Sequence, residues 1–96
     1  MKLSSKQIRY LRGLAHHRSP AVTLGAQGLT PAVLAEIDGA LVHHELLKIK
    51  LSSGDKSARH QMLERICEVT QATAVQEIGR MAVVFKPGVK SSIALP

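Results

Sequence analysis

The sequence predicts a single compact α/β domain, with elements in the order α-β-α-β-α-β-β and a four-stranded mixed sheet packed with helices. Three observations point to this fold class. A chain of 96 residues, of which 45% are hydrophobic, has room for one modest core. Segments with the apolar spacing of helices alternate with short strand-like segments. The last two strand-like segments are separated by a short turn, which predicts an antiparallel hairpin.

The first helix is expected over residues 5–16. Ser4 and Gln7 have the spacing of a capping box at its start. Lys6 and Arg9 fall on one side of this helix, with Arg12 at the edge of that side. The opposite side carries the apolar residues Ile8, Leu11, Leu14 and Ala15. Two interpretations of the basic side are open, an anion-binding surface and a solvated helix face.

A short strand over residues 21–24 leads through a glycine-containing loop into a second helix over residues 31–43. Thr30 is the expected N-cap of this helix and Pro31 its first residue. The side expected in the core carries Val33, Leu34, Ile37 and Leu41. The loop therefore leads directly into the start of a capped helix.

The next segments are expected to form a strand over residues 45–51, a turn over 52–55 and a third helix over 56–71. In the strand, Lys48 and Lys50 alternate with apolar residues, so we expect these lysines on one face of the sheet. The other face carries Leu47, Ile49 and Leu51. The third helix has Met62, Leu63, Ile66 and Val69 at core spacing.

Strands over residues 73–78 and 81–86 complete the sheet. They are joined by Gly79 and Arg80, which stand in the order that a type II′ turn requires. We expect both strand-helix-strand units to be right-handed parallel crossovers. Residues 1–96 are thus expected to form one domain, with residues 87–96 as a loosely ordered tail.

Positive charge is concentrated at the two ends of the chain. The chain has 13 Lys and Arg against 7 Asp and Glu, a formal net charge of +6. Residues 1–18 carry a net charge of +5 and residues 79–96 a net charge of +3, which leaves −2 for the middle. This balance favours a polyanionic partner such as nucleic acid. The only aromatic residues, Tyr10 and Phe85, are too few for a platform on which bases stack.

Several features predict a cytoplasmic protein without a membrane partner. No segment has the length and apolarity of a membrane span, and Arg9 and Arg12 interrupt the region where a signal peptide would be apolar. The single cysteine, Cys67, has no partner for an internal disulfide, which agrees with a reducing compartment.

The strand-to-helix loop Gly25-Ala26-Gln27-Gly28 is the most informative local feature. Glycine allows the backbone to approach a ligand closely, and amides at the following helix start can donate to phosphate oxygens. KH domains hold a nucleic-acid backbone with a GXXG loop in this manner. The alternative is a plain turn. The loop has neither the dinucleotide-binding nor the Walker pattern, so nucleotide hydrolysis is not indicated.

The reactive side chains do not form a pattern typical of metal binding or catalysis. The histidine pairs at 16–17 and 43–44 are sequence neighbours, which cannot chelate a metal from one helix face. Cys67 has the spacing of a core residue, and Glu64 and Glu68 that of a solvated helix face. We therefore expect neither an enzyme nor a bound cofactor or metal.

A set of short motifs is spread over nearly the whole chain. They are Lys6-Gln7, Leu11-Arg12, Ala15-His16, Pro20, Leu24-Gly25, Gly28-Leu29, Glu36-Ile37, Ala40-Leu41 and the run His44-Glu45-Leu46-Leu47-Lys48. Together they resemble the CRM domain family, in particular its small single-domain bacterial YhbY-like members. The resemblance implies an RNA-binding domain with a fold similar to the C-terminal domain of translation initiation factor three. It also implies association with precursors of the large ribosomal subunit.

The resemblance implies RNA contacts from the GxxG loop and from a basic N-terminal helix. The RNA-binding residues are then Gly25, Ala26, Gln27, Gly28, Leu29, Thr30, Lys2, Lys6, Arg9 and Arg12. The implied partner is large-subunit ribosomal RNA or its precursor in a pre-ribosomal particle, bound by a monomer. Family loops often hold a basic residue between the glycines, whereas Ala26 and Gln27 are neutral. The adjoining helix is therefore expected to supply the charge.

Two other function classes are open on the sequence. One is a protein-interaction module that docks on a ribosomal protein or another acidic partner, with the charge of +6 only steering association. The other is a small enzyme, which would need a metal or cofactor. The sequence also leaves open whether Lys48, Lys50, Arg80 and Lys86 join the RNA surface.

Overall fold

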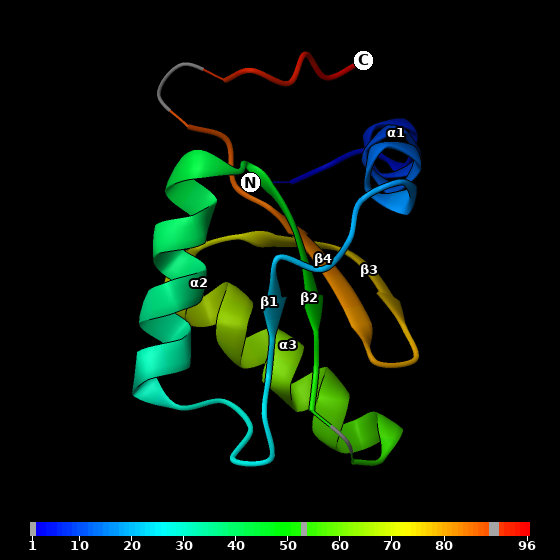
Figure 1. The fold of residues 1–96 in the computed structure, drawn as a ribbon. Helices are drawn as coiled ribbons and strands as arrows, with labels where there is room; N and C mark the ends of the chain where they lie inside the picture. Colours follow the sequence, from blue (N-terminus) through cyan, green and yellow to red (C-terminus); the bar gives the residue numbers. More distant parts are fainter. Residues whose placement is uncertain (1, 53, 89–90) are drawn as a thin grey trace.

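The computed structural model describes residues 2–52, 54–88 and 91–96 of the chain. Its helices and strands follow the predicted order (Figure 1): α1 (Ser5–His16), β1 (Val22–Thr23), α2 (Pro31–His43), β2 (Leu46–Lys50), α3 (Lys56–Thr70), β3 (Thr73–Ile78) and β4 (Met81–Phe85). The predicted α/β class is confirmed. Of the helices in these residues, none has both the length and the apolar character that crossing a membrane requires.

The strands form one mixed sheet in the order β1-β2-β4-β3. β1 runs parallel to β2, whereas β4 runs antiparallel to both of its neighbours, β2 and β3. The last strand of the chain therefore lies between β2 and β3, which point in the same direction but are not paired with each other. The four-stranded mixed sheet is confirmed, with its closing hairpin in place.

Side chains near the helix ends explain where the helices begin and end. The Ser4 hydroxyl accepts from the Gln7 amide and the Gln7 side chain accepts from the Ser4 amide, so the predicted capping box is present. Thr30 and Asp55 cap α2 and α3 by accepting from the amide three residues further on. α3 ends one residue earlier than predicted, because Gln71 takes a left-handed conformation with φ of 63°.

Three strands are shorter than predicted. β1 has two residues where 21–24 were expected, although the amides of Ala21 and Leu24 still donate to carbonyls of β2. β2 lacks the predicted residues 45 and 51, and β4 lacks residue 86. The turn at 52–55 includes residue 53, which lies outside the described residues. Gly79 has φ of 56°, as the predicted type II′ turn requires.

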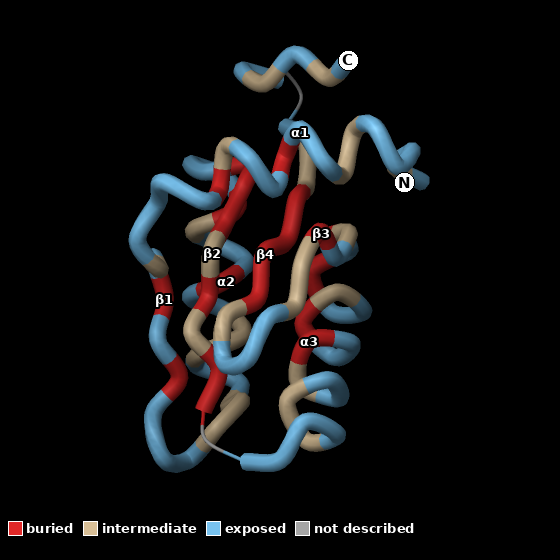
Figure 2. Tube along the Cα trace, turned by 90° about the vertical axis from the view of Figure 1, so that its right-hand side faces the viewer, coloured by how far each residue is buried: buried red, intermediate tan, exposed pale blue. Residues whose placement is uncertain are grey.

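Apolar side chains form a cluster on each face of the sheet. α2 and α3 cover one face, where they pack on Leu47, Ile49 and Leu51 of the β2 segment. α1 crosses the other face near one end of the strands and packs on Leu46 and Phe85 (Figure 2). The apolar sides predicted for all three helices therefore meet the sheet, and the β2 segment alternates as predicted.

One residue of α3 differs from its predicted burial. Val69 is 44% exposed, whereas Thr70 is only 1% exposed. The Thr70 hydroxyl donates to the carbonyl of Ile66, so this polar side chain is satisfied within the core. The helical spacing of the core residues is thus confirmed up to Ile66, but the prediction that Val69 is a core residue is wrong, because Thr70 takes the buried place.

The residues after β4 form no helix or strand where they are described, but they contact the body of the domain. The Glu45 carboxylate accepts from the amides of Gly88 and Ser92. Ile93 and Leu95 pack against the cluster beneath α1. Residues 89–90 of the predicted loose tail lie outside the described residues, and the mobility of the tail stays a prediction.

Candidate nucleic-acid interface

The sheet face that α1 crosses is not covered by another described helix over its remaining part (Figure 2). Side chains alternate along a strand, so Lys48 and Lys50 point to the same face as Leu46 beneath α1. Thr23 of β1 and Met81 of β4 pair with Lys50 and share this face. Two lysines therefore lie in the middle of an open area of sheet.

Two arginines flank these lysines. The Arg18 guanidinium donates to the Leu46 carbonyl over 2.9 Å, and Arg80 donates through Nε to the Leu51 carbonyl over 3.1 Å. Lys48 donates through Nζ to the carbonyls of Ala15 and Arg18, at 3.4 and 3.2 Å. Its charge thus stabilises the carbonyl end of α1, where a helix carries partial negative charge. A recess of about 380 Å³, lined in part by Arg18 and Lys48, opens beside them.

The cations of α1 extend the same surface. Lys6, Arg9 and Arg12 are exposed on the helix, as predicted, and α1 contains no acidic residue. We call these residues, together with Arg18, Lys48, Lys50 and Arg80, the basic face. By alternation, the open strand positions of this face are Thr23, Lys48, Lys50, Gln76, Ile78 and Met81. None of these strand residues is acidic, so no negative charge separates the cations at these positions.

The GxxG loop forms a tight turn after β1. Gly25, Ala26 and Gln27 are exposed, and the Gly28 amide donates to the Gly25 carbonyl over 3.0 Å. Gly28 has φ of 71°, a conformation that disfavours most side chains. A Cβ at this position would lie 3.6 Å from Ser52 Oγ, an ordinary contact. The glycine is therefore required by the backbone conformation rather than by lack of space.

The start of α2 offers fewer free donors than the sequence predicts. Pro31 has no amide hydrogen, the Val33 amide donates to the Thr30 hydroxyl, and the Leu34 amide donates to the Thr30 carbonyl. Within the described residues this leaves the Ala32 amide as the first-turn donor without a partner. Two predicted site residues also have structural roles, because Thr30 caps the helix and Leu29 packs against the core.

The structure does not bring the GxxG loop and α1 together. They lie towards opposite ends of the sheet (Figures 1 and 2). The Leu24 amide, next to the loop, donates to the Lys50 carbonyl. The Arg80 side chain donates to the carbonyl of Leu51, the residue after Lys50. The expectation that the adjoining N-terminal helix charges the loop is therefore wrong. The cations that lie between α1 and the GxxG loop come from β2 and the β3–β4 hairpin.

The sequence left the role of four cations undecided. Lys48, Lys50 and Arg80 belong to the basic face. The alternation along the strand was the sequence signal that could have placed Lys48 and Lys50 there, whereas Arg80 is placed by its contact with the Leu51 carbonyl. Lys86 follows Phe85, which points beneath α1, and it lines a different recess beside Asp38 of α2. Lys86 therefore lies away from the basic face. Lys2 is exposed ahead of α1.

The run His44-Glu45-Leu46-Leu47-Lys48 has mainly structural roles. Glu45 holds the C-terminal segment, Leu46 and Leu47 enter opposite apolar clusters, and Lys48 caps the end of α1. Hydrogen bonds from the Gly88 amide and then the Ser92 amide lower the pKa of Glu45 to about 2, against the opposing effect of burial. This run thus joins α1, the sheet and the C-terminal segment.

The other reactive side chains form no recognisable centre. No group of three or more His, Cys, Asp or Glu in the described residues is arranged to hold a metal ion. Cys67 is half-buried against the core, and burial raises the pKa of its thiol. The thiol is therefore in its weakly nucleophilic protonated form at neutral pH.

Comparisons with known proteins agree with this arrangement. Residues 3–86 match the model of the CRS1/YhbY (CRM) domain. A protein of Haemophilus influenzae named "RNA-binding protein" is 46% identical over 94 residues, covering 98% of this chain and 95% of that one. A "Probable RNA-binding protein" of Pseudomonas aeruginosa is 36% identical over 90 residues, covering 94% and 86% of the two chains.

A solved structure has the same fold. The solution structure of a Staphylococcus aureus protein superposes with a TM-score of 0.86 and 32% identity, covering 99% of this chain and 100% of that one. The family model spans the basic face from α1 to β4, together with the GxxG loop. The chain therefore belongs to the CRS1/YhbY (CRM) domain family.

Proposed function

We propose that this protein binds structured RNA through the basic face, with the GxxG loop contacting the same RNA at the far end. The observation that carries the proposal is the gathering of seven cations on one face whose open strand positions include no acid. They come from α1, the segment that follows it, the sheet and its hairpin. The names of the Haemophilus and Pseudomonas relatives support RNA as the ligand.

Phosphate groups are the main point of contact in this proposal. Lysine and arginine displace the counterions of the RNA backbone, which supplies affinity that depends on salt. At the loop, the exposed turn from Gly25 to Gln27 allows the backbone to approach a phosphate closely, and the Ala32 amide can donate to it. The exposed Gln27 side chain can hydrogen-bond a sugar or a base.

The aromatic residues favour recognition of RNA shape over base stacking. Phe85 is buried beneath α1, and Tyr10 is the one exposed aromatic side chain. A-form helices and their junctions display phosphates and 2′-hydroxyls in a regular pattern that cations and amides can follow without stacking. Structured RNA therefore fits this surface better than an unpaired strand.

The proposal extends to large-subunit ribosomal RNA or its precursor, bound in the cytoplasm by a monomer within a pre-ribosomal particle. Its support is the resemblance of the chain to small single-domain YhbY-like proteins, which implies association with large-subunit precursors. In this role the protein is a non-enzymatic assembly factor that holds RNA in position.

Binding to protein-free RNA tests the proposal. Purified protein should bind a structured fragment of precursor ribosomal RNA, and the double variant Lys50→Gln/Arg80→Gln should bind it roughly tenfold more weakly or worse. The matched control is Lys86→Gln, which removes a cation away from the basic face and should leave affinity unchanged. A protein that binds ribosomal proteins but no protein-free RNA would instead be an interaction module.

Ultraviolet cross-linking in cells, with sequencing of the attached RNA, tests the identity of the RNA. We expect cross-links to concentrate in large-subunit ribosomal RNA and to include unprocessed precursor ends. Cross-links spread evenly over messenger and ribosomal RNA would contradict the assembly role while leaving RNA binding itself intact.

A further inference from the structure

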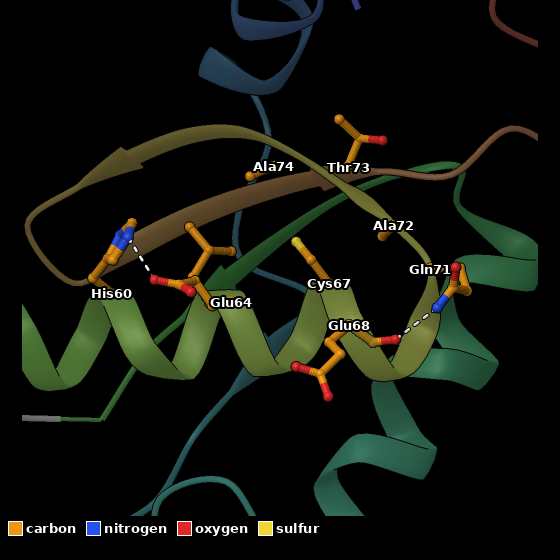
Figure 3. Close-up of a pocket in the computed structure, with 9 residues that line it drawn as sticks. His60, Glu64, Cys67, Glu68, Gln71, Ala72, Thr73 and Ala74 are labelled. Carbon is orange, nitrogen blue, oxygen red and sulfur yellow. Dashed lines mark hydrogen bonds and ion pairs between the residues drawn. The ribbon is translucent and has the colours of Figure 1, made fainter. Parts of the chain in front are cut away.

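A groove between α3 and β3 lies apart from the basic face. It has a volume of about 510 Å³ and is bounded by α3 on one side and the start of β3 on the other (Figure 3). Cys67 points from α3 towards β3, and the small side chains of Ala72 and Ala74 leave room above it. The groove is thus open to solvent and has a small, largely apolar floor.

The groove runs beside an edge strand. β3 is the last strand of the sheet, with β4 as its sheet neighbour, and no other strand of the described residues pairs with it. It is six residues long, whereas β1 at the opposite edge has two. The outer edge of a strand presents amides and carbonyls that an extended peptide can pair with. β3 is therefore the longer of the two edges available for strand addition.

The rim of the groove is acidic. Glu64 and Glu68 have side-chain exposures of 66% and 73%. Arg65 pairs with Glu68 over 3.1 Å from outside the groove, and no lysine or arginine of the described chain lines the groove itself. At one end, His60 contacts Glu64 and Glu77, each over 2.8 Å, which joins α3 to β3. The hydrogen bond that the Glu77 carboxylate accepts from His60 raises the pKa of His60. Three of the chain's 7 acidic residues therefore gather here, although its net charge is +6.

We propose that this α3–β3 groove binds an extended segment of a protein partner that is rich in lysine and arginine, which adds as a strand to β3. Alternate side chains of such a strand point towards α3, where their charges meet Glu64 and Glu68. Small residues of the segment fit above Cys67 and Ala74. None of the cations of the basic face lines this groove, so this proposal stands whether or not that face binds RNA.

The charge arrangement favours a cationic peptide over RNA at this groove. Phosphates would face Glu64 and Glu68 across a short distance, which disfavours a polyanion. The groove lies on the side of the sheet covered by α3, and α1 lies on the other side. A partner at the groove and a polyanion at the basic face can therefore be held at the same time.

A fluorescein-labelled peptide of alternating lysine and threonine, added to the full chain, tests the proposal. We expect saturable binding that weakens with salt, and slower amide exchange within Thr73–Ile78 but not at Val22–Thr23 of the opposite edge. The variants Glu64→Lys and Glu68→Lys should each weaken binding about threefold, and the pair about tenfold. A peptide of alternating glutamate and threonine should not bind.

Glu36→Lys is the matched control, because Glu36 is exposed on α2, away from the groove. It makes the same change in net charge as either groove variant and should leave peptide affinity unchanged. Equal weakening by Glu36→Lys would show that only net charge matters and would overturn the proposal. Absence of binding, or binding without protection of β3 amides, would also overturn it.

Discussion

Glu45 holds the chain after β4 against the start of β2. Its carboxylate accepts from the Gly88 and Ser92 amides and from the Ser92 hydroxyl, which lies 2.9 Å away. The charged form is favoured at this position because every one of these partners is a donor. One residue therefore couples the C-terminal segment to the sheet.

Glu45→Gln should destabilise the domain by about 1.5 to 3 kcal/mol, because charge-assisted hydrogen bonds are lost and an amide donor then faces another donor. Urea denaturation measures the change, and Glu36→Gln, at an exposed position of α2, is the control. Hydrogen exchange at Ser92 should speed up in the Glu45 variant. Unchanged exchange there would show that the carboxylate does not hold the segment.

The pKa of Glu45 also predicts a pH dependence. Its pKa is about 2 in the folded chain and 4.5 ordinarily, so the unfolded chain takes up the proton first as the pH falls. The contribution of Glu45 is complete above pH 4.5 and is lost as the pH falls towards 2. The stability difference between the wild type and Glu45→Gln should therefore shrink in this interval. A difference that is constant with pH would contradict the prediction.

Gly28 allows charge to be separated from conformation. Its φ of 71° is tolerated by Asn and Asp better than by other residues, so Gly28→Asn and Gly28→Asp should have similar stability. Gly28→Asp should bind RNA roughly fivefold more weakly than Gly28→Asn, because a like charge near a phosphate costs about 1 kcal/mol in water. Fluorescence anisotropy with a structured RNA measures the ratio, and equal affinities would place the loop outside the interface.

At the scale of an element, the packing of α2 on the sheet depends on a few buried residues along one side of the helix. Ile37 is fully buried, and Ile37→Ala should cost roughly 2 to 5 kcal/mol, the range for large-to-small changes in a core. Val42, five residues further along α2, is 77% exposed, and Val42→Ala should change stability by less than about 0.5 kcal/mol. Leu34 is half-buried, so Leu34→Ala should lower the free energy of unfolding less than Ile37→Ala does. Urea denaturation of the variants tests this order.

Over the whole molecule, the cations predict a definite salt dependence. If about four phosphates are neutralised, log K should fall with log salt at a slope of roughly −3. Arg9→Gln/Arg12→Gln at α1 and Lys50→Gln/Arg80→Gln near the loop should each roughly halve this slope, whereas Lys86→Gln should leave it unchanged. A slope altered only by the α1 pair would confine RNA to that end of the face.

Local sequence predicted the elements well, because the signals that define them lie within a few residues. The Ser4–Gln7 capping box, the Thr30 cap and the apolar spacing of α1 are all present in the structure. The strand ends were predicted less accurately. The length of β1 is set by how many of its residues pair with β2, and not by the residue types along β1 itself. Thr70 is buried in place of Val69 because its hydroxyl donates a hydrogen bond to the Ile66 carbonyl of the same helix.

The sequence by itself determined the fold class, the element order, the GxxG turn and the basic side of α1, because periodicity, caps and glycine conformations act over short distances. Only the tertiary structure decided that β4 enters between β2 and β3, that Lys50 and Arg80 rather than α1 lie towards the loop, and that Glu45 holds Ser92. These features join residues far apart in the chain. Such contacts form through packing of the whole sheet and its helices, which local periodicity does not encode.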